Sequence, residues 1–256
     1  MTADVEPAKG PAVETDGLAV SYGRTRVLDG ITLSVPRGSV FALLGRNGSG
    51  KTSLLRCLLG QRPPAAGRAR LLGEDPWRHR RRLMERVGVV PEDPNAFPEM
   101  TARQLSAFCG RLHTRWDGAA VEERLRRFEV PTDRPFGRLS KGQKGAVMLA
   151  LGLGHTPELL LLDDPTLGLD VVARDTVFRE VIGDLADRGT TVFVTTHELR
   201  AVEGLADHVA ILHGGRMALN GSLEQVKAEW GRPLEEIFAA VAGTGGTAPA
   251  KTEVPS

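Results

Sequence analysis

The chain has 256 residues, a formal net charge of +1 and only two cysteines, Cys57 and Cys109, which match no metal-binding spacing. This length suits an α/β domain with an inserted subdomain that folds without disulfides, and the balanced charge gives no bulk attraction to nucleic acid or membranes. The acidic start does not have the pattern of a secretory signal and no apolar run reaches the roughly 18 residues of a transmembrane helix, so we expect a soluble, cytoplasmic protein.

The first part of the chain predicts a disordered lead followed by two strands. Residues 1–13 are small, polar and Pro-containing, which favours disorder. Residues 17–22 and 27–35 have the alternating apolar character of strands, with Gly23 between them. Tyr22, the only tyrosine, ends the first of these strands. Its ring can stack on an adenine base, although a lone tyrosine at a strand end is more often a packing residue.

A glycine-rich loop between a buried strand and a helix is the strongest motif of the chain. The strand is expected at 39–44 and the helix at 53–59, where leucines recur at helical spacing. This is the context of a P-loop, in which backbone N–H groups point at phosphate oxygens. Lys51 adds positive charge at the β- and γ-phosphates, and the Thr52 hydroxyl is a ligand for Mg²⁺. The predicted phosphate-binding residues are Gly45, Arg46, Asn47, Gly48, Ser49, Gly50, Lys51, Thr52 and Ser53.

The next part of the chain changes from strands to helices. Strands are expected at 68–72 and 87–90. Between them, Trp77 to Arg82 is a basic run that opens a helix; it is either a solvated helix face or a contact with an acidic partner or lipid headgroups. No strand signal appears between about 93 and 157, which predicts a helical insertion in an α/β core. The helical patterns lie at 102–115, 119–129 and 139–154.

Two acidic residues, Asp163 and Asp164, follow the buried strand at 159–162. The carboxyl ends of parallel strands form the edge of the sheet where ligands bind. We therefore expect Asp163 to hold Mg²⁺ through water and Asp164 to polarise the attacking water. His197 follows the strand at 190–196 at the same edge, where a neutral imidazole can hydrogen-bond the γ-phosphate.

The remaining sequence continues the alternation of helices and strands and ends in a polar tail. The expected helices lie at 171–188, 222–230 and 233–241, and the expected strands at 206–213 and 216–219. The tail after residue 242 consists of Gly, Thr, Ala, Pro and charged residues, which favours disorder.

In their order along the chain, these motifs resemble the nucleotide-binding subunit of an ATP-binding cassette (ABC) transporter, from about residue 14 to 230. The implied fold is α/β: a P-loop NTPase (RecA-like) core with an N-terminal antiparallel β region and an inserted α-helical subdomain. One ABC ATP-binding domain, 14–242, then lies between a disordered lead, 1–13, and a disordered tail, 243–256. Its parts are the core at about 14–92 and 158–220, the helical subdomain at about 93–157 and the C-terminal helices at 222–241.

The resemblance also implies roles for single residues. Tyr22 stands where the family has the aromatic residue that stacks on adenine, and Glu92 stands in the Q-loop, which contacts Mg²⁺ and the permease. Asp170, after Leu169, corresponds to the D-loop, and His197 to the switch histidine. The signature loop corresponds to Leu139, Ser140, Lys141, Gly142 and Gln143.

The implied function is hydrolysis of ATP with Mg²⁺ to drive a separately encoded membrane permease of the exporter type. Two ATP-binding subunits, identical or not, dock head to tail, with each ATP between the P-loop of one and the Ser140 helix of the other. The subunit would lie on the inner face of the cell membrane through its permease. A nucleic-acid partner is not expected, because the chain has no long coiled-coil insertion, no second cassette and no strong basic bias.

The sequence departs from the family pattern at three places. Glu92 replaces the usual glutamine, Asp164 the usual catalytic glutamate, and Lys141 a common glycine of the signature. Asp164 is one methylene shorter than glutamate, so its contact of roughly 3 Å with the attacking water is weakened. Slow turnover with intact ATP binding is therefore expected. The alternative is a switch that binds ATP and dimerises with little hydrolysis.

Overall fold

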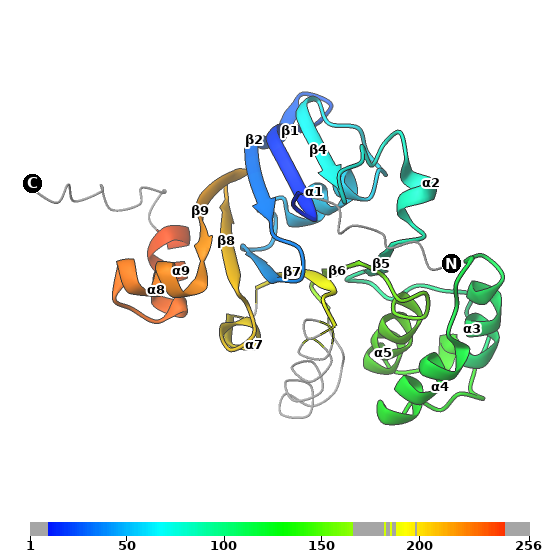
Figure 1. The fold of residues 1–256 in the computed structure, drawn as a ribbon. Helices are drawn as coiled ribbons and strands as arrows, with labels where there is room; N and C mark the ends of the chain where they lie inside the picture. Colours follow the sequence, from blue (N-terminus) through cyan, green and yellow to red (C-terminus); the bar gives the residue numbers. More distant parts are fainter. Residues whose placement is uncertain (1–9, 166–181, 183–184, 186–187, 198, 244–256) are drawn as a thin grey trace, which may run out of the picture.

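The structure is a computed structural model that describes residues 10–165, 182, 185, 188–197 and 199–243. Its strands form two sheets (Figure 1). The smaller sheet is antiparallel with the order β2-β1-β4, and the larger has the order β5-β6-β7-β3-β8-β9. The strands are β1 (Val13–Tyr22), β2 (Thr25–Val35), β3 (Val40–Leu44), β4 (Ala66–Leu71), β5 (Val87–Val90), β6 (Leu159–Asp163), β7 (Thr191–Thr196), β8 (His208–His213) and β9 (Arg216–Ser222).

The larger sheet is parallel except for β9, which pairs antiparallel with β8. Strand β7 lies between β3 and β6, so it aligns the ends of two strands that are far apart in sequence. Leu44, the last residue of β3, pairs with Thr196, and Asp163 of β6 pairs with Thr195. The register of β7 therefore brings the glycine-rich loop and the two acidic residues to one edge of the sheet.

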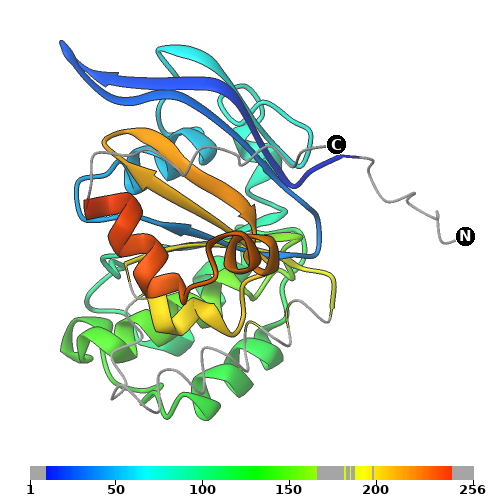
Figure 2. The same ribbon diagram turned by 90° about the vertical axis from the view of Figure 1, so that its left-hand side faces the viewer.

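The helices lie on both sides of this sheet (Figure 1). Helix α1 lies between the two sheets, α3, α4 and α5 lie beyond the β5 end, and α8 and α9 pack at β9 and β8. Figure 2 shows α7 and α9 side by side at that second end. The helices are α1 (Lys51–Leu58), α2 (Arg80–Leu83), α3 (Ala102–Gly110), α4 (Gly118–Arg127), the short 3-10 helix η1 (Phe136–Arg138), α5 (Lys141–Gly152), α7 (Leu199–Glu203), α8 (Leu223–Trp230) and α9 (Leu234–Gly243).

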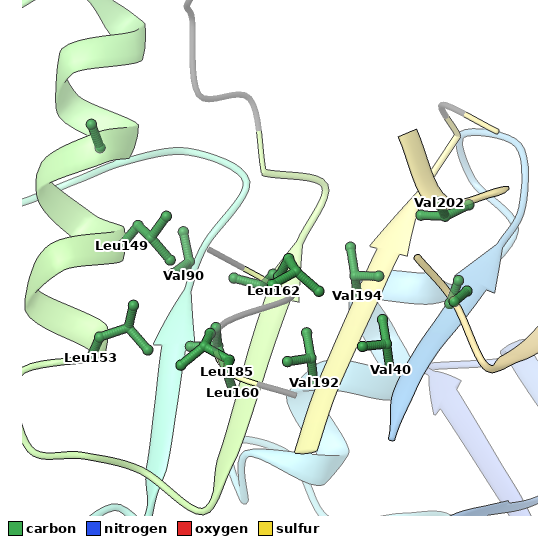
Figure 3. Packing of buried hydrophobic residues seen from close by; sticks show 14 of the residues in the cluster. Val40, Val90, Leu149, Leu153, Leu160, Leu162, Leu185, Val192, Val194 and Val202 are labelled. Carbon is green, nitrogen blue, oxygen red and sulfur yellow. The ribbon is translucent and has the colours of Figure 1, made fainter. Parts of the chain in front are cut away.

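The central strands are buried on both faces, which explains their continuous apolar sequences. Leu160 and Leu162 of β6 pack in one cluster with residues of α5 and β7 (Figure 3), while Leu159 and Leu161 pack in a second cluster with α1 and the smaller sheet. The alternation follows from the two-residue period of a strand. The four leucines at 159–162 are thus buried alternately on the two faces of the sheet, which fixes the strand and therefore the position of Asp163 at its end.

The fold confirms the predicted α/β class, with a glycine-rich loop between β3 and α1 and a separate antiparallel β region. Most strand bounds agree with the prediction within two residues, and two strands differ by more. β1 begins at Val13, inside the stretch expected to be disordered, because Ala12 and Val13 are buried and the Ala12 N–H donates to the Val35 carbonyl at 2.8 Å. β9 continues to Ser222, beyond the expected end at residue 219, because it stays paired with β8 along its length.

Two predicted helices differ most from their expected bounds. The helix expected to open at Trp77 begins only at Arg80, within the basic run, as the single turn α2. Before it, the Asp75 carboxylate accepts the Trp77 N–H at 2.9 Å in a local turn. The helix expected over 102–115 ends at Gly110 as α3. There Trp116 folds back on the helix, since a Cβ at Gly110 would lie 2.9 Å from its Cδ1 atom.

Some predictions concern residues that the structure does not describe, and one helix was missed. Residues 1–9 of the predicted lead, most of the predicted helix at 171–188 and the predicted tail from 244 lie outside the described residues. Helix α7 was not predicted, because its five residues are too few for a periodic pattern. Within the described residues, no helix has the length and apolar character needed to cross a membrane.

A close backbone contact fixes α5 against the sheet and gives a first testable prediction. A Cβ at Gly88 of β5 would lie 2.3 Å from the carbonyl oxygen of Gly152 and 3.0 Å from Leu160 Cδ1. Gly88→Ala is therefore expected to lower the free energy of unfolding by about 1–3 kcal/mol, measured by urea denaturation. Gly118→Ala is the control, because its Cβ would have no neighbour nearer than 3.8 Å. Equal stability of the two variants would show that α5 can move away without cost.

The buried imidazole of His155 gives a second prediction, on pH and stability. Its ring stacks on that of His113, with 4.3 Å between the ring centres. Burial is the main cause that lowers the pKa of His155 to about 4, and the nearby His113 lowers it further. A histidine with a lowered pKa binds more protons unfolded than folded, so stability is lost as the pH falls from about 6.5 to about 4. We expect about 2–3 kcal/mol of this loss to disappear in His155→Phe, measured as the difference between two denaturation series. Parallel pH profiles for the two proteins would contradict it.

Candidate functional site

The glycine-rich loop joins β3 to α1 and folds over the N-terminus of that helix. Gly48 and Gly50 have φ angles of +80° and +110°, in the left-handed region where glycine carries no Cβ penalty. The loop is closed by the Ser49 N–H, which donates to the Arg46 carbonyl at 3.1 Å. No side chain fits at Gly45, where a Cβ would lie 2.5 Å from Ser49 Oγ. The glycines therefore let the loop return to the helix and leave backbone N–H groups facing outward.

Lys51 lies at the start of α1 with only 7% of its surface exposed. Its ammonium group donates to the carbonyl oxygens of Gly45 at 2.7 Å and Arg46 at 3.4 Å. Burial lowers the pKa of Lys51 below its usual value, and the carboxylates of Asp164, Asp163 and Glu92 act in the opposite direction. The loop thus holds a buried positive charge next to three acidic side chains.

The two acidic residues are held by the end of β7. Thr195 Oγ1 donates to the Asp163 carboxylate at 2.7 Å, and the Asp164 N–H donates to the Thr195 carbonyl at 2.9 Å. Nδ1 of His197 lies 2.6 Å from the Asp164 carboxylate, and Thr196 Oγ1 lies 3.4 Å from its other oxygen. Asp164 has a φ of +42°, a region that aspartate tolerates better than most residues. The carboxylate of Asp164 is therefore fixed by β7.

These elements surround a cavity of about 420 Å³. Ser49 Oγ is buried there without a hydrogen-bond partner in the described part of the chain, and Lys51 supplies a cation, so the residues fit an anionic phosphate group. The residues that line the cavity are Val27, Asn47, Gly48, Ser49, Gly50, Lys51, Thr52, Ser53, Glu92, Asp163 and Asp164.

A magnesium ion fits this cavity only together with a phosphate. Among the described residues, no three His, Cys, Asp or Glu side chains come close enough together to hold a metal. Mg²⁺ usually takes one or two protein oxygens and completes its shell with water and phosphate oxygens. Thr52, Asp163 and Glu92 all line the cavity and present such oxygens.

Several predicted residues do not line the cavity within this chain. Gly45 and Arg46 lie behind the loop as acceptors for Lys51, and His197 reaches the site through Asp164. Ser140, Gly142 and Gln143 lie at the N-terminus of α5, where the Ser140 hydroxyl accepts the Gln143 N–H at 3.2 Å in a capping box. Asp170 lies outside the described residues.

Tyr22 lies beside α1 and is also absent from the cavity lining. The neighbouring Ser53 hydroxyl is the main cause that lowers the pKa of the Tyr22 phenol, with Arg56 and Arg62 acting in the same direction. The guanidinium carbon of Arg62 lies 3.9 Å from the centre of the ring. One face of this ring is thus covered by an arginine, so a stacking partner would have to use the opposite face.

Sequence reasoning missed three residues of the site. Val27 of β2 lines the cavity, and Thr195 and Thr196 orient the acidic pair. The two threonines directly precede His197, so their place at the sheet edge was a usable signal. Val27 left no signal, because it reaches the cavity only through the packing of the smaller sheet on the P-loop.

Comparison with known proteins decides the family. The sequence profile described as "ABC transporter" matches residues 28–167, which is more than half of the chain. The chain belongs to the ABC transporter family, as an ATP-binding subunit. The Nod factor export ATP-binding protein I of Ralstonia nicotianae is 35% identical over 235 residues, 89% of this chain and 73% of that protein. The daunorubicin resistance ATP-binding protein DrrA3 of Streptomyces coeruleorubidus is 36% identical over 242 residues, 93% and 76% of the two chains.

A solved structure supports the same assignment. The ATP-binding subunit of an ABC transporter superposes with a TM-score of 0.80 at 26% identity, covering 90% of this chain and 98% of that one. The family consists of ATPases coupled to transport, and this ABC subunit is therefore an ATPase that binds ATP. ABC subunits of this kind work with membrane permease components.

Proposed function

We propose that this ABC subunit hydrolyses Mg-ATP to power a separately encoded permease of the export type. The proposal is carried by the arrangement around one cavity of buried Lys51, the acidic residues Asp163 and Asp164, and the Ser49 hydroxyl, which has no partner among the residues that the structure describes. Phosphoryl transfer depends on positioned charges and on an oriented nucleophile, and this cavity supplies both.

In this mechanism the P-loop N–H groups and Lys51 bind the β- and γ-phosphates. Thr52, Asp163 and Glu92 are the residues that would hold Mg²⁺, which when bound offsets the negative charge of the phosphates. Asp164 orients and activates the attacking water, and His197 keeps the Asp164 carboxylate in place and hydrogen-bonds the γ-phosphate. Tyr22 stacks on the adenine base.

A second subunit completes the site in this proposal. The signature residues Ser140, Gly142 and Gln143 lie on α5, outside the cavity lining of their own chain, and Gly88 holds that helix firmly against β5. In a head-to-tail dimer, identical or mixed, the N-terminus of α5 faces the γ-phosphate bound by the partner subunit. ATP binding would then close the dimer and move the helices α3 to α5 together with the permease.

The export direction is supported by the relatives. One is named for Nod factor export and another for daunorubicin resistance. The subunit would act on the inner face of the cell membrane through its permease, because ATP is supplied from that side. Purification of the chain from membranes together with an integral partner tests this placement, and recovery without any membrane partner would contradict it.

A second candidate function is a switch that dimerises on ATP with little hydrolysis. The observation that favours it is that Asp164, which is shorter than the usual glutamate, already has its carboxylate against His197 at 2.6 Å and Thr196 at 3.4 Å. A carboxylate held in this way has less freedom to contact the attacking water.

One pair of measurements separates the two functions. Phosphate release and sedimentation are measured on the same sample of the subunit with its permease, at saturating Mg-ATP. Steady turnover that falls with loss of Lys51 supports the coupled ATPase. ATP-dependent dimerisation without turnover above the Lys51→Ala background supports the switch. The control is ADP, which lacks the γ-phosphate and is expected to leave the subunits apart.

A further inference from the structure

The tyrosine that we assign to the base carries an arginine on one face. The Arg62 guanidinium carbon lies 3.9 Å from the centre of the Tyr22 ring, and its Nη2 donates to the Ser21 carbonyl in the same strand. A guanidinium over an aromatic face at this distance is a cation–π contact. Two interactions therefore bind the Arg62 side chain to the end of β1.

Backbone hydrogen bonds also fix the main chain at Arg62, so the position of its Cα atom is defined. The Arg62 N–H donates to the Arg56 carbonyl at 3.2 Å at the end of α1, and the Ala65 N–H donates to the Ala19 carbonyl at 2.8 Å. Pro63 and Pro64 lie between these two anchors and restrict the backbone. The turn that carries the arginine is thus fixed to α1 before Arg62 and to β1 after it.

This arrangement determines which face of the Tyr22 ring is available. One face lies under Arg62, while the hydroxyl is buried and turned toward Ser53 and Arg56 of α1, the helix that carries Thr52 at its start. Because Arg62 occupies this face, a purine can stack only on the opposite face of the ring. The two contacts of Arg62 also restrict rotation of the ring, so less rotational freedom is lost when a base binds.

We propose that Arg62 is a positioning residue for the nucleotide base: it backs the Tyr22 ring and holds it in the orientation that stacks on adenine. The proposal rests on the proposed function, because it takes Tyr22 as the base-stacking residue. Arg62 acts through Tyr22 rather than on the phosphates, so its contribution depends on the base and on the tyrosine.

The test compares two ligands that differ in the base, Mg-ATP and Mg-tripolyphosphate, by calorimetry on the full chain. Arg62→Ala is expected to weaken ATP binding about three- to fivefold and to leave tripolyphosphate binding unchanged. Arg62→Lys keeps the charge but not the planar group, so its ATP affinity is expected to lie between those of the natural protein and Arg62→Ala. In a Tyr22→Ala background, Arg62→Ala is expected to cause no further loss. Arg70→Ala, an exposed arginine on β4, is the matched control.

Three results would overturn the proposal. Equal losses of affinity for both ligands would mean that Arg62 contacts the phosphates. Losses of ATP affinity that add to those of Tyr22→Ala would mean that Arg62 acts independently of the ring. Tighter ATP binding by Arg62→Ala would mean that Arg62 must move off the ring before the base can bind. Folding of each variant is checked by its thermal unfolding.

A second measurement distinguishes failure of this proposal from failure of the proposed function. Tyr22 is the only tyrosine of the chain, so labelling with 3-fluorotyrosine gives one ¹⁹F signal, from this ring alone. ATP, but not tripolyphosphate, is expected to shift that signal, and Arg62→Ala is expected to broaden it. ATP binding without any shift of the ¹⁹F signal would overturn the base-stacking role of Tyr22 and the positioning role of Arg62, but it would leave the proposed ATPase function intact. Absence of ATP binding altogether would overturn the proposed function as well.

Discussion

Asp164→Asn is expected to lower kcat for ATP hydrolysis at least about a hundredfold, because the amide cannot take a proton from the attacking water. ATP affinity is expected to change less than about threefold, since the P-loop and Lys51 are untouched. The amide keeps the size of the side chain and its contact with Thr196. Turnover is measured as phosphate release at saturating Mg-ATP, and affinity by calorimetry.

Asp164→Glu is the informative companion, since it restores the length that is usual in the family. If reach limits turnover, kcat should rise about tenfold. The positive φ of +42° favours aspartate over glutamate, so the same variant should lose some stability. Ordinary rates for the natural protein together with no gain in Asp164→Glu would refute the slow-turnover expectation. Undiminished turnover in Asp164→Asn would assign the base to another residue.

Lys51→Ala is expected to reduce kcat/KM for ATP by at least about a thousandfold, the largest effect of any single change considered. Its ammonium group is the one buried cation among the described residues lining the cavity, and such a group stabilises transition-state charge far more than it would in water. Coupled phosphate-release assays over a range of ATP concentrations measure this ratio.

The control for Lys51 must account for its structural hydrogen bonds. Lys51 also donates to the carbonyls of Gly45 and Arg46, so its loss can distort the loop. Lys51→Arg keeps a cation and a donor, and it is expected to retain the loop while losing most of the activity, because the larger planar group does not fit the same place. If Lys51→Ala unfolds at the same temperature as the natural protein yet loses activity, the electrostatic role is supported. Full activity in Lys51→Ala would exclude this role.

The local elements of the site could be predicted because each has a strong sequence signal. The glycines at 45, 48 and 50 mark a turn, the apolar run at 159–162 marks a buried strand, and the order of the motifs marks the family. Predictions failed where local patterns are short or where tertiary contacts decide the bounds. Helix α7 has only five residues, and α3 ends where Trp116 folds back on Gly110.

The relation between Tyr22 and Arg62 shows the same limit. The sequence places Arg62 forty residues after Tyr22, with two strands, the glycine-rich loop and a helix between them, and no periodicity connects them. The contact forms because the turn after α1 is tied to β1 by hydrogen bonds between the two segments. Such long-range contacts depend on the packing of whole elements, which single-sequence patterns do not contain.

The sequence by itself indicated the chemical groups of the proposed site: a glycine-rich loop with Lys51, a strand that delivers Asp163 and Asp164, and a histidine at the same sheet edge. These follow from local composition, since glycine, lysine and aspartate act at fixed offsets from a strand or a helix. The tertiary structure alone decided how the groups meet. The register of β7 between β3 and β6 sets Thr195, Thr196 and His197 against the acidic pair, because hydrogen-bonded strands align residues that are distant in sequence.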